Sequence, residues 1–280
     1  MFESFLFIPG NRTDIINNIS NVDSDYKIID FEDSISSDEI SVSSKNLLLI
    51  KEKSNVFIRL SFYLKKNELN VDFLDNIVKL GYRNFIIPKI DNKSQLLKIK
   101  EFLTDKKYNI NEFNFILLIE SSLALMTIRS ILESDILNIQ GAALGSFDYC
   151  LDMNMEYDIS NFSWARNYLL NISKAYKIKA IDIVSMEIQS QKVIRDEIID
   201  SFRLGFEGKL FIHPCQIKTL RNTRLFSYEQ IQEAYTICSL IDKKNIQDVN
   251  VFKYMGKVYE KPHINRMINI INWHKRYGKQ

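Results

Sequence analysis

Eight short apolar runs recur along this chain, separated by segments that each have room for a helix, and this repetition constrains the fold more than any other feature. The runs cover residues 5–9, 27–31, 56–60, 84–88, 115–119, 141–145, 179–184 and 209–213. Most are continuously apolar, as in parallel strands that are covered on both faces. Eight strand–helix units are the number that closes a (β/α)₈ TIM barrel, so we expect an α/β fold of this class.

The segments between the runs have the periodicity of amphipathic helices and the length of crossover connections. We expect helices over residues 13–19, 72–80, 93–104, 123–132, 163–176, 193–204 and 217–222. Residues 34–44 are rich in serine and are expected to be low-complexity sequence. The barrel is therefore predicted to occupy residues 1–222 as a single unit.

Residues 223–280 are predicted to form a C-terminal helical extension. Ser227 and Gln230 match a capping box before a helix over 228–241, and Pro262 is placed to begin a last helix that ends near residue 276. Residues 242–253 are polar and are expected to form a loop. A tail of this size is too small to bury a core of its own. We therefore expect it to lie across a barrel, its own or a neighbour's, as a lid or an oligomer contact.

The composition argues against several classes of partner. The 280 residues carry a formal net charge of +2, with both signs interspersed, so neither nucleic acid nor a membrane surface is an expected partner. No apolar run approaches the roughly 18 residues of a membrane span, and no signal peptide is recognisable. The three cysteines form no CxxC pair and are interpreted as packing residues. We expect a cytoplasmic protein.

Polar and charged residues collect where the predicted strands end. In a TIM barrel these C-terminal strand ends and the loops behind them build the active site. The residues at or just past the ends are Asn11, Arg12, Glu32, Asp33, Arg59, Lys89, Glu120, Asp148, Ser185 and His213.

Glu120 and Asp148 are the predicted metal ligands. They follow two consecutive strands, so they are expected to be close enough to share a ligand, and two carboxylates suit Mg²⁺, which prefers oxygen donors. The alternative is that Glu120 forms a structural ion pair with Arg59 or Lys89. The three histidines have no spacing partner, so a histidine-based metal site is not expected.

Arg59 is the clearest candidate for binding an anion. An arginine that closes an apolar strand is costly to bury without an anionic partner, and its planar group suits a carboxylate or an enolate oxygen. Lys89 is either a second positive group or a strand terminator. Asp30, Glu32 and Asp33 repel one another unless a cation or hydrogen bonds compensate, or else they are solvated surface.

Covalent and nucleotide chemistry are not indicated by the residues. Neither GxxxxGK[ST] nor GxGxxG occurs in the sequence, so no phosphate-loop or dinucleotide site is expected. There is no serine or cysteine nucleophile motif, and no lysine is expected inside a strand. Covalent catalysis is therefore not predicted.

Taken in order, short segments of the chain resemble the citrate lyase β-subunit family of Mg²⁺-dependent acyl-CoA lyases, in the HpcH/HpaI aldolase superfamily. The segments are LFIPG (6–10), IDFEDS (29–34), IRL (58–60), IPK (87–89), LIE (118–120), GSFD (145–148), AID (180–182), LGFEGK (204–209), IHPCQI (212–217) and GKVYEKPH (256–263). They span nearly the whole chain in the family's order.

The resemblance implies a reaction: reversible carbon–carbon cleavage of a 3-hydroxyacyl thioester, of the citryl, malyl or citramalyl type, into an acyl thioester and a 2-oxo acid. It implies that Glu120 and Asp148 hold Mg²⁺ and that Arg59 contacts the oxo acid or the enolate. Glu260 stands at the position of the acid that the lid supplies, commonly from a neighbouring subunit, so a homo-oligomer such as a trimer is expected.

The remaining candidate residues come from the resemblance for residues 9–12, and from their places at the strand ends for Lys89, Glu32 and Asp33. Pro9, Gly10 and Arg12 are expected near the CoA or carrier-thioester arm, and Lys89 is a further substrate-binding candidate. Glu32 and Asp33 are candidate catalytic groups beside Arg59.

The chain departs from the family pattern at several positions. The family usually has Asp where Glu260 stands, and residues expected to be basic are Asn18, Ile40 and Ser44. Since such cations hold phosphates, an acyl carrier other than CoA stays open. Two alternatives remain: an aldolase that acts on free 2-oxo acids without CoA, or a non-catalytic barrel that binds a metal and an oxo acid.

Overall fold

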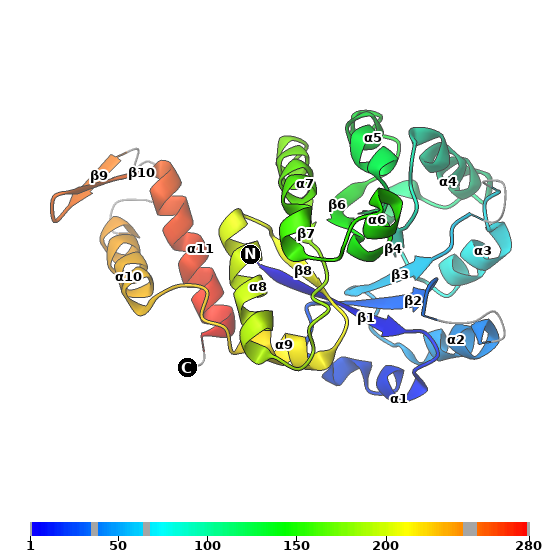
Figure 1. The fold of residues 1–280 in the computed structure, drawn as a ribbon, viewed down its shortest axis with the longest axis horizontal. Coiled ribbons are helices and arrows are strands. Elements are labelled where there is room, and N and C mark those ends of the chain that lie inside the picture. The colour runs from blue at the N-terminus through cyan, green and yellow to red at the C-terminus, as the bar shows by residue number, and fades with distance from the viewer. Residues whose placement is uncertain (1, 35–38, 64–67, 243–250, 279–280) are drawn as a thin grey trace. The chain divides into compact units, whose positions relative to one another are not determined.

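The computed structural model describes residues 2–34, 39–63, 68–242 and 251–278. Eight parallel strands close into a barrel in sequence order, with β8 paired to β1 (Figure 1). The strands are β1 (Glu3–Pro9), β2 (Tyr26–Phe31), β3 (Val56–Leu60), β4 (Asn84–Ile87), β5 (Asn114–Ile119), β6 (Ile139–Leu144), β7 (Lys179–Asp182) and β8 (Gly208–Phe211). The predicted TIM barrel is confirmed.

Helices follow the strands and cover the outside of the barrel (Figure 1). The helices of this unit are α1 (Thr13–Ile16), α2 (Ile40–Asn46), α3 (Val71–Lys79), α4 (Lys93–Asp105), α5 (Ser122–Glu133), α6 (Ser146–Met153), α7 (Ser163–Ala175), α8 (Gln191–Leu204) and α9 (Pro214–Arg221). Helix α7 packs on β6 and β7, and α8 packs on β8. None of the helices in the described ranges is both long and apolar enough to cross a membrane.

The barrel interior is filled by apolar side chains contributed by every strand. Its core consists of Phe5, Ile28, Phe57, Ile86, Ile116, Leu118, Ala143, Ile181 and Leu210. Successive residues of a strand point to opposite faces, so these positions fix which side chains point inward. Residues two positions later on the same strand point inward again, at the carboxyl end of the barrel. Residues one position away, such as Asp182 and Lys209, point outward toward the helices.

The described residues from Arg221 onward form a second compact unit, and the division falls after Leu220. Its helices are α10 (Tyr228–Asp242) and α11 (Lys261–Tyr277), which pack on each other, and its strands β9 (Val251–Tyr254) and β10 (Lys257–Glu260) form an antiparallel hairpin. Within the unit, Trp273 packs edge-on against Phe226 at 5.4 Å between ring centroids. The Tyr259 hydroxyl donates to Glu233 at 2.7 Å.

Three expectations about local structure are wrong or incomplete. Helix α2 begins within the serine-rich segment, and helix α6, which was not predicted, begins one residue after the end of β6, at Ser146. Strand β9 begins within the segment expected to be loop, and the hairpin turns at Met255 and Gly256, which both have positive φ, as a tight two-residue turn requires. The remainder of that segment, 243–250, lies outside the described residues.

The expectation that no lysine lies inside a strand is also wrong. Lys27, Lys179 and Lys209 are members of β2, β7 and β8. Lys209 is completely buried, on the outward face of its strand. It does not line the cavity described below, so it gives no support to covalent catalysis.

Candidate functional site

The alternation of side chains along the strands brings three charged residues together at the carboxyl end of the barrel. Asp30, Arg59 and Glu120 each lie two positions beyond a core residue of the same strand, so they share the inward face. Asp30 and Arg59 are also direct neighbours in the register of β2 and β3. All three side chains are buried or nearly so.

A cavity of about 530 Å³ opens at this end of the barrel. It is lined by Phe7, Pro9, Asp30, Asp33, Ser34, Arg59, Leu118, Glu120, Gly145, Ser146, Phe147, Asp148, Val184, Met186, Leu210 and Ile212. Both predicted metal ligands are therefore on the wall of one cavity, together with Arg59.

Arg59 is the centre of the charged cluster. Its Nε and Nη2 each donate to Asp30 at 2.7 Å, in a bidentate pair. Its Nη1 lies 3.2 Å from Asp33, 3.4 Å from Glu32 and 3.9 Å from Glu120. Burial works against the charge of Arg59, but the hydrogen bonds and charge of Asp30 outweigh it and raise the arginine pKa. Arg59 is a fixed cation held among carboxylates.

Glu32 connects Arg59 to Lys89. Its Oε1 lies 3.1 Å from Lys89 Nζ, while its buried Oε2 has no hydrogen-bond partner among the described residues. Burial raises the pKa of Glu32, Arg59 offsets part of the shift, and Asp33 adds to it. Lys89 Nζ lies 3.6 Å from Asp33 as well. Lys89 is therefore paired with two carboxylates and is absent from the lining of the described cavity.

Glu120 is a buried carboxyl group whose negative charge is only partly compensated by its neighbours. Its Oε2 accepts the backbone N–H of Lys89 at 2.8 Å, which the left-handed φ of +50° at Lys89 permits. Burial raises the pKa of Glu120 to about 8, and the charge of Glu32 adds to the shift. The Lys89 N–H and Arg59 offset it only in part, and Asp148 raises it further. A structural ion pair between Glu120 and Arg59 was the alternative interpretation. At 3.9 Å, Arg59 compensates only part of the negative charge of the Glu120 carboxylate.

Gly145 provides the space that Glu120 occupies. A Cβ added at Gly145 would overlap Cγ of Glu120 and lie 3.0 Å from its Oε1. Asp148 stands in the first turn of α6, the helix that begins one residue later, and makes no hydrogen bond or ion pair within the described ranges. At the β6–α6 junction, Gly145 thus leaves space for the Glu120 carboxylate, and the first turn of α6 carries the Asp148 carboxylate.

These observations fit a hard divalent cation. Two oxygen donors line one cavity, one of them has its pKa raised by burial and neighbouring negative charge, and a cation would relieve both effects. Mg²⁺ is commonly held by only one or two carboxylates, with water or substrate oxygens completing its shell. Accordingly, no group of three or more His, Cys, Asp or Glu side chains suited to a metal is found in the described parts of the chain.

The three residues expected near the thioester arm occupy different environments. Pro9 lines the cavity, whereas Gly10 is buried beside it, with its N–H bonded to Asp30 O and its carbonyl accepting from Asn46. Arg12 is exposed and forms a bidentate pair with Asp14 instead. Arg12 is not among the residues that line the cavity in the described structure.

Glu260 belongs to the C-terminal unit, where it is the N-cap residue of α11. Its backbone N–H donates to His263 Nδ1 at 3.2 Å, as part of a capping box. Its expected role as a lid acid stays a prediction.

Two features of the cavity were not predicted from the sequence. The first is the apolar wall made by Val184, Met186 and Ile212, none of which was a candidate site residue. The second is Gln216, a fully buried polar residue in α9 that bonds to the backbone of those loops. A glutamine three residues into a helix after Ile-His-Pro was the available signal, because a side chain there can reach back to the preceding loop.

Comparison with known proteins places the chain among lyases. It is 23% identical over 273 residues to the citrate lyase subunit beta of Leuconostoc mesenteroides subsp. cremoris, covering 94% of this chain and 90% of that protein. It is 20% identical over 287 residues to the mitochondrial citramalyl-CoA lyase of Mus musculus, covering 95% and 84%.

The fold has close counterparts among solved structures. The protein CitE of Mycobacterium tuberculosis, in complex with magnesium, acetoacetate and coenzyme A, superposes with a TM-score of 0.75 at 18% identity, covering 97% of this chain and 98% of that one. The citrate lyase beta subunit of the same organism, with oxaloacetate and magnesium, gives a TM-score of 0.67 at 18% identity, covering 79% and 96%.

Residues 3–214 match the model of the HpcH/HpaI aldolase/citrate lyase family. The resemblance found in the sequence is thereby confirmed, and with it the prediction of a lyase-class enzyme. The chain belongs to the HpcH/HpaI aldolase/citrate lyase family.

Proposed function

We propose that the cavity at the carboxyl end of the barrel is the active site of a Mg²⁺-dependent lyase. The reaction is reversible cleavage of a 3-hydroxyacyl thioester, of the citryl, malyl or citramalyl type, into an acyl thioester and a 2-oxo acid. The observation that carries the proposal is the pair Glu120 and Asp148 on one cavity wall beside Arg59, with the pKa of Glu120 raised to about 8.

Glu120 and Asp148 would hold the ion. When bound there, Mg²⁺ would supply Lewis-acid polarisation of the 2-oxo group. The metal complexes of the related CitE proteins, which contain magnesium with oxaloacetate or with acetoacetate and coenzyme A, support this assignment.

The protein's own groups account for the charge and the protons. Arg59 offsets negative charge on the substrate oxygens, and Asp30 and Glu32 fix its guanidinium. Asp33, which lines the cavity 3.2 Å from Arg59, is the candidate for accepting the hydroxyl proton. As the carbon–carbon bond breaks, its electron pair passes to the thioester α-carbon, where Glu260 is the candidate acid.

The test is formation of a 2-oxo acid from a 3-carboxy-3-hydroxyacyl-CoA, with Mg²⁺ or with EDTA. We expect turnover only with Mg²⁺, and its loss in Asp148→Asn. The matched control is Asp152→Asn, one helical turn further along α6, where the exposed carboxylate caps α5 by accepting the Ser122 N–H. Turnover in EDTA, or equal loss in both variants, would contradict the proposal.

The nature of the acyl carrier is a separate question. Arg12 is paired with Asp14 and so is not open to bind a phosphate of CoA. This observation supports the aldolase that acts on free acids as a second candidate function. Cleavage of the free hydroxy acid without cleavage of the thioester would select that candidate. Mg²⁺-dependent binding of oxo acids without turnover of either would select the non-catalytic barrel.

A further inference from the structure

Two chemically different sets of side chains line the cavity. Carboxylates and Arg59 form one of them. The other is apolar and is built from Leu118, Phe147, Val184, Met186 and Ile212. Among the cavity-lining residues that the structure describes, Arg59 is the one cation. Residues 145–152, which are Gly145 and most of helix α6, and the β7–α8 loop, residues 183–190, contain no lysine or arginine.

Among the residues that the structure describes, the two cations beside the cavity, Arg59 and Lys89, are each paired with carboxylates. Arg59 forms its bidentate pair with Asp30 and faces Glu32 and Asp33, while Lys89 faces the same two acids. The five carboxylates Asp30, Glu32, Asp33, Glu120 and Asp148 therefore surround the two cations Arg59 and Lys89. The formal charge is minus three, and a bound divalent ion leaves minus one. A second carboxylate on the oxo acid would meet an excess of negative charge.

The apolar wall is held in place by hydrogen bonds to its backbone. In the β7–α8 loop, Lys209 Nζ donates to Ile183 O at 2.8 Å, and the Tyr157 hydroxyl donates to Val184 O at 3.4 Å. Gln216 Nε2 donates to the carbonyls of Ser185 and Glu187 at 2.8 and 2.9 Å. Cys215 Sγ also donates to Ile188 O at 3.3 Å, so five carbonyls of this loop accept hydrogen bonds from side chains.

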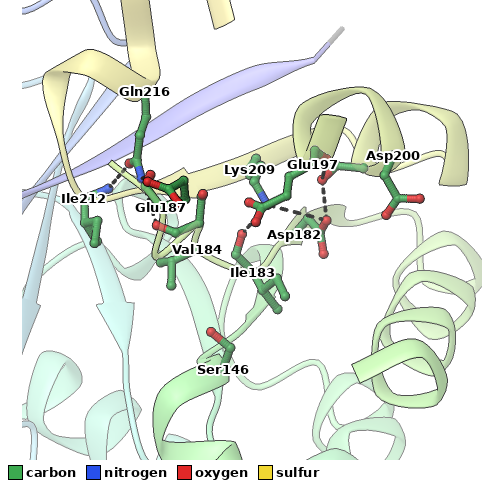
Figure 2. A network of polar contacts seen from close by, with 12 residues as sticks. Ser146, Asp182, Ile183, Val184, Glu187, Glu197, Asp200, Lys209, Ile212 and Gln216 are labelled. Atoms are coloured by element: carbon green, nitrogen blue, oxygen red, sulfur yellow. Dashed lines mark hydrogen bonds and ion pairs between the residues drawn. The ribbon is translucent and has the colours of Figure 1, made fainter. Parts of the chain in front are cut away.

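The same glutamine also fixes the loop after β8. Gln216 Oε1 accepts the backbone N–H of Ile212 at 2.9 Å (Figure 2). It also accepts the backbone N–H of His213 at 3.1 Å. One fully buried side chain therefore joins the segments that carry Val184, Met186 and Ile212. Lys209 is anchored in turn, 3.9 Å from Asp182 and 4.0 Å from Glu197 (Figure 2). A wall fixed in this way cannot readily rearrange to present a polar group.

From these observations we propose that the 2-oxo acid handled here is a monocarboxylate with a small alkyl substituent, and not a dicarboxylate. The α-oxo acid group would face the metal ligands and Arg59, and the alkyl group would lie against Val184, Met186 and Ile212. An alkyl group gains by leaving water for this wall, whereas a carboxylate there is desolvated without a partner. This inference rests on the proposed function and narrows its substrate.

The test is calorimetric binding of oxo acids to the full-length protein in the presence of Mg²⁺. Pyruvate and 2-oxobutanoate are compared with oxaloacetate and 2-oxoglutarate. We expect the monocarboxylates to bind at least about 10-fold more tightly. Mg²⁺-dependent binding with equal or tighter affinity for the dicarboxylates would overturn this inference and leave the proposed function standing. Binding of none of the four would overturn both.

Two variants test the position of the wall. Met186→Arg places a cation on it, at a side chain exposed enough to accept the change, and should shift the preference toward oxaloacetate by about 10-fold. Val193→Arg is the control, because it adds the same charge at an exposed position on α8 outside the cavity lining. An equal shift in both variants would show that net charge, not the wall, sets the preference, and would overturn the inference.

Discussion

Glu120 is a carboxyl group that burial holds against ionisation. Its pKa is about 8 in the folded protein, against an ordinary value of 4.5. Between these pH values this group has lost its proton in the unfolded chain and kept it in the folded chain, so the contribution of Glu120 to the stability of the metal-free protein falls as pH rises from about 4.5 to about 8. A bound cation reverses the preference by favouring the ionised form.

Replacing Glu120 by Gln should therefore have opposite effects on stability and on metal binding. In EDTA at pH 8 the variant should be more stable than the wild type by on the order of 2–4 kcal/mol, since the ionisation penalty is removed. Urea unfolding at pH 5 and pH 8 measures this, and the gain should shrink at pH 5. Added Mg²⁺ should stabilise only the wild type. If the free energies of unfolding of the two proteins had the same pH dependence, burial of Glu120 would not destabilise its ionised form.

Gly145 tests the geometry of the same side chain from the opposite direction. In Gly145→Ala the new Cβ displaces Glu120, so the Kd for Mg²⁺ should rise by about 10- to 100-fold. Gly81→Ala is the matched control, since Gly81 has φ +91° and open space around it, and the change should cost about 1 kcal/mol of stability without affecting the metal. Fluorescence titration with Mn²⁺ and urea unfolding separate the two. Unchanged affinity in Gly145→Ala would contradict the assignment of Glu120.

At the level of single residues, the sequence predicted which side chains lie at the strand ends, but it did not predict which residues these side chains contact. Strand periodicity was enough to anticipate that Arg59 and Glu120 share the barrel mouth, because the alternation is regular. It could not show that Arg12 pairs with its near neighbour Asp14, which is a matter of local loop conformation. Nor could it show that Lys209 is buried, because a lysine at the edge of an apolar run normally reaches solvent.

Among the elements, α7, β7 and α8 are joined by one buried arginine. Arg166 on α7 donates to both oxygens of Asp182 on β7, at 2.9 and 2.6 Å, and to Asp200 on α8 at 2.8 Å. Asp182 is completely buried, and burial alone would raise its pKa. Lys209 and Arg166 outweigh that effect and lower the Asp182 pKa. The helix layer is thus fixed to the barrel by charge as well as by apolar packing.

Removing that arginine should cost far more than removing an exposed one. Arg166→Met leaves Asp182 buried without its bidentate partner and should lower the free energy of unfolding by about 3–5 kcal/mol. Arg129→Met breaks only an exposed pair with Glu133 on α5 and should cost at most about 1 kcal/mol. Urea unfolding at pH 7 measures both. Similar small losses would mean that Lys209 alone compensates Asp182.

The accuracy of the predicted elements followed the strength of their apolar signal. All eight strands were located, because a buried parallel strand is a continuous apolar run with few alternatives. Helix α2 was missed because three of its seven residues are serine, and α6 because only Gly145 separates its first residue, Ser146, from the end of β6 at Leu144. The hairpin was missed because Met255 occupies a turn position that Asn or Asp normally fills.

For the whole molecule, the central question is whether the C-terminal unit supplies a catalytic group. The resemblance predicts that Glu260 supplies an acid, and Glu260 also begins α11. Glu260→Gln keeps the length and an acceptor oxygen at that N-cap but removes the acid. We expect kcat to fall by about 100- to 10,000-fold with little change in KM or in stability. Equal loss in kcat and in affinity would make the unit a binding element.

The prediction that this acid acts on a neighbouring subunit has its own test, in which two inactive variants are mixed. Glu120→Gln lacks a metal ligand but keeps Glu260, and Glu260→Gln has the reverse defect. If the acid reaches across subunits, exchange produces sites with both groups, and an equimolar mixture should recover about a quarter of wild-type activity. If each acid serves its own barrel, every site stays defective and the mixture is inactive. Size-exclusion chromatography with light scattering, on the same samples, establishes that an oligomer is present to exchange; a monomer would refute the predicted homo-oligomer directly.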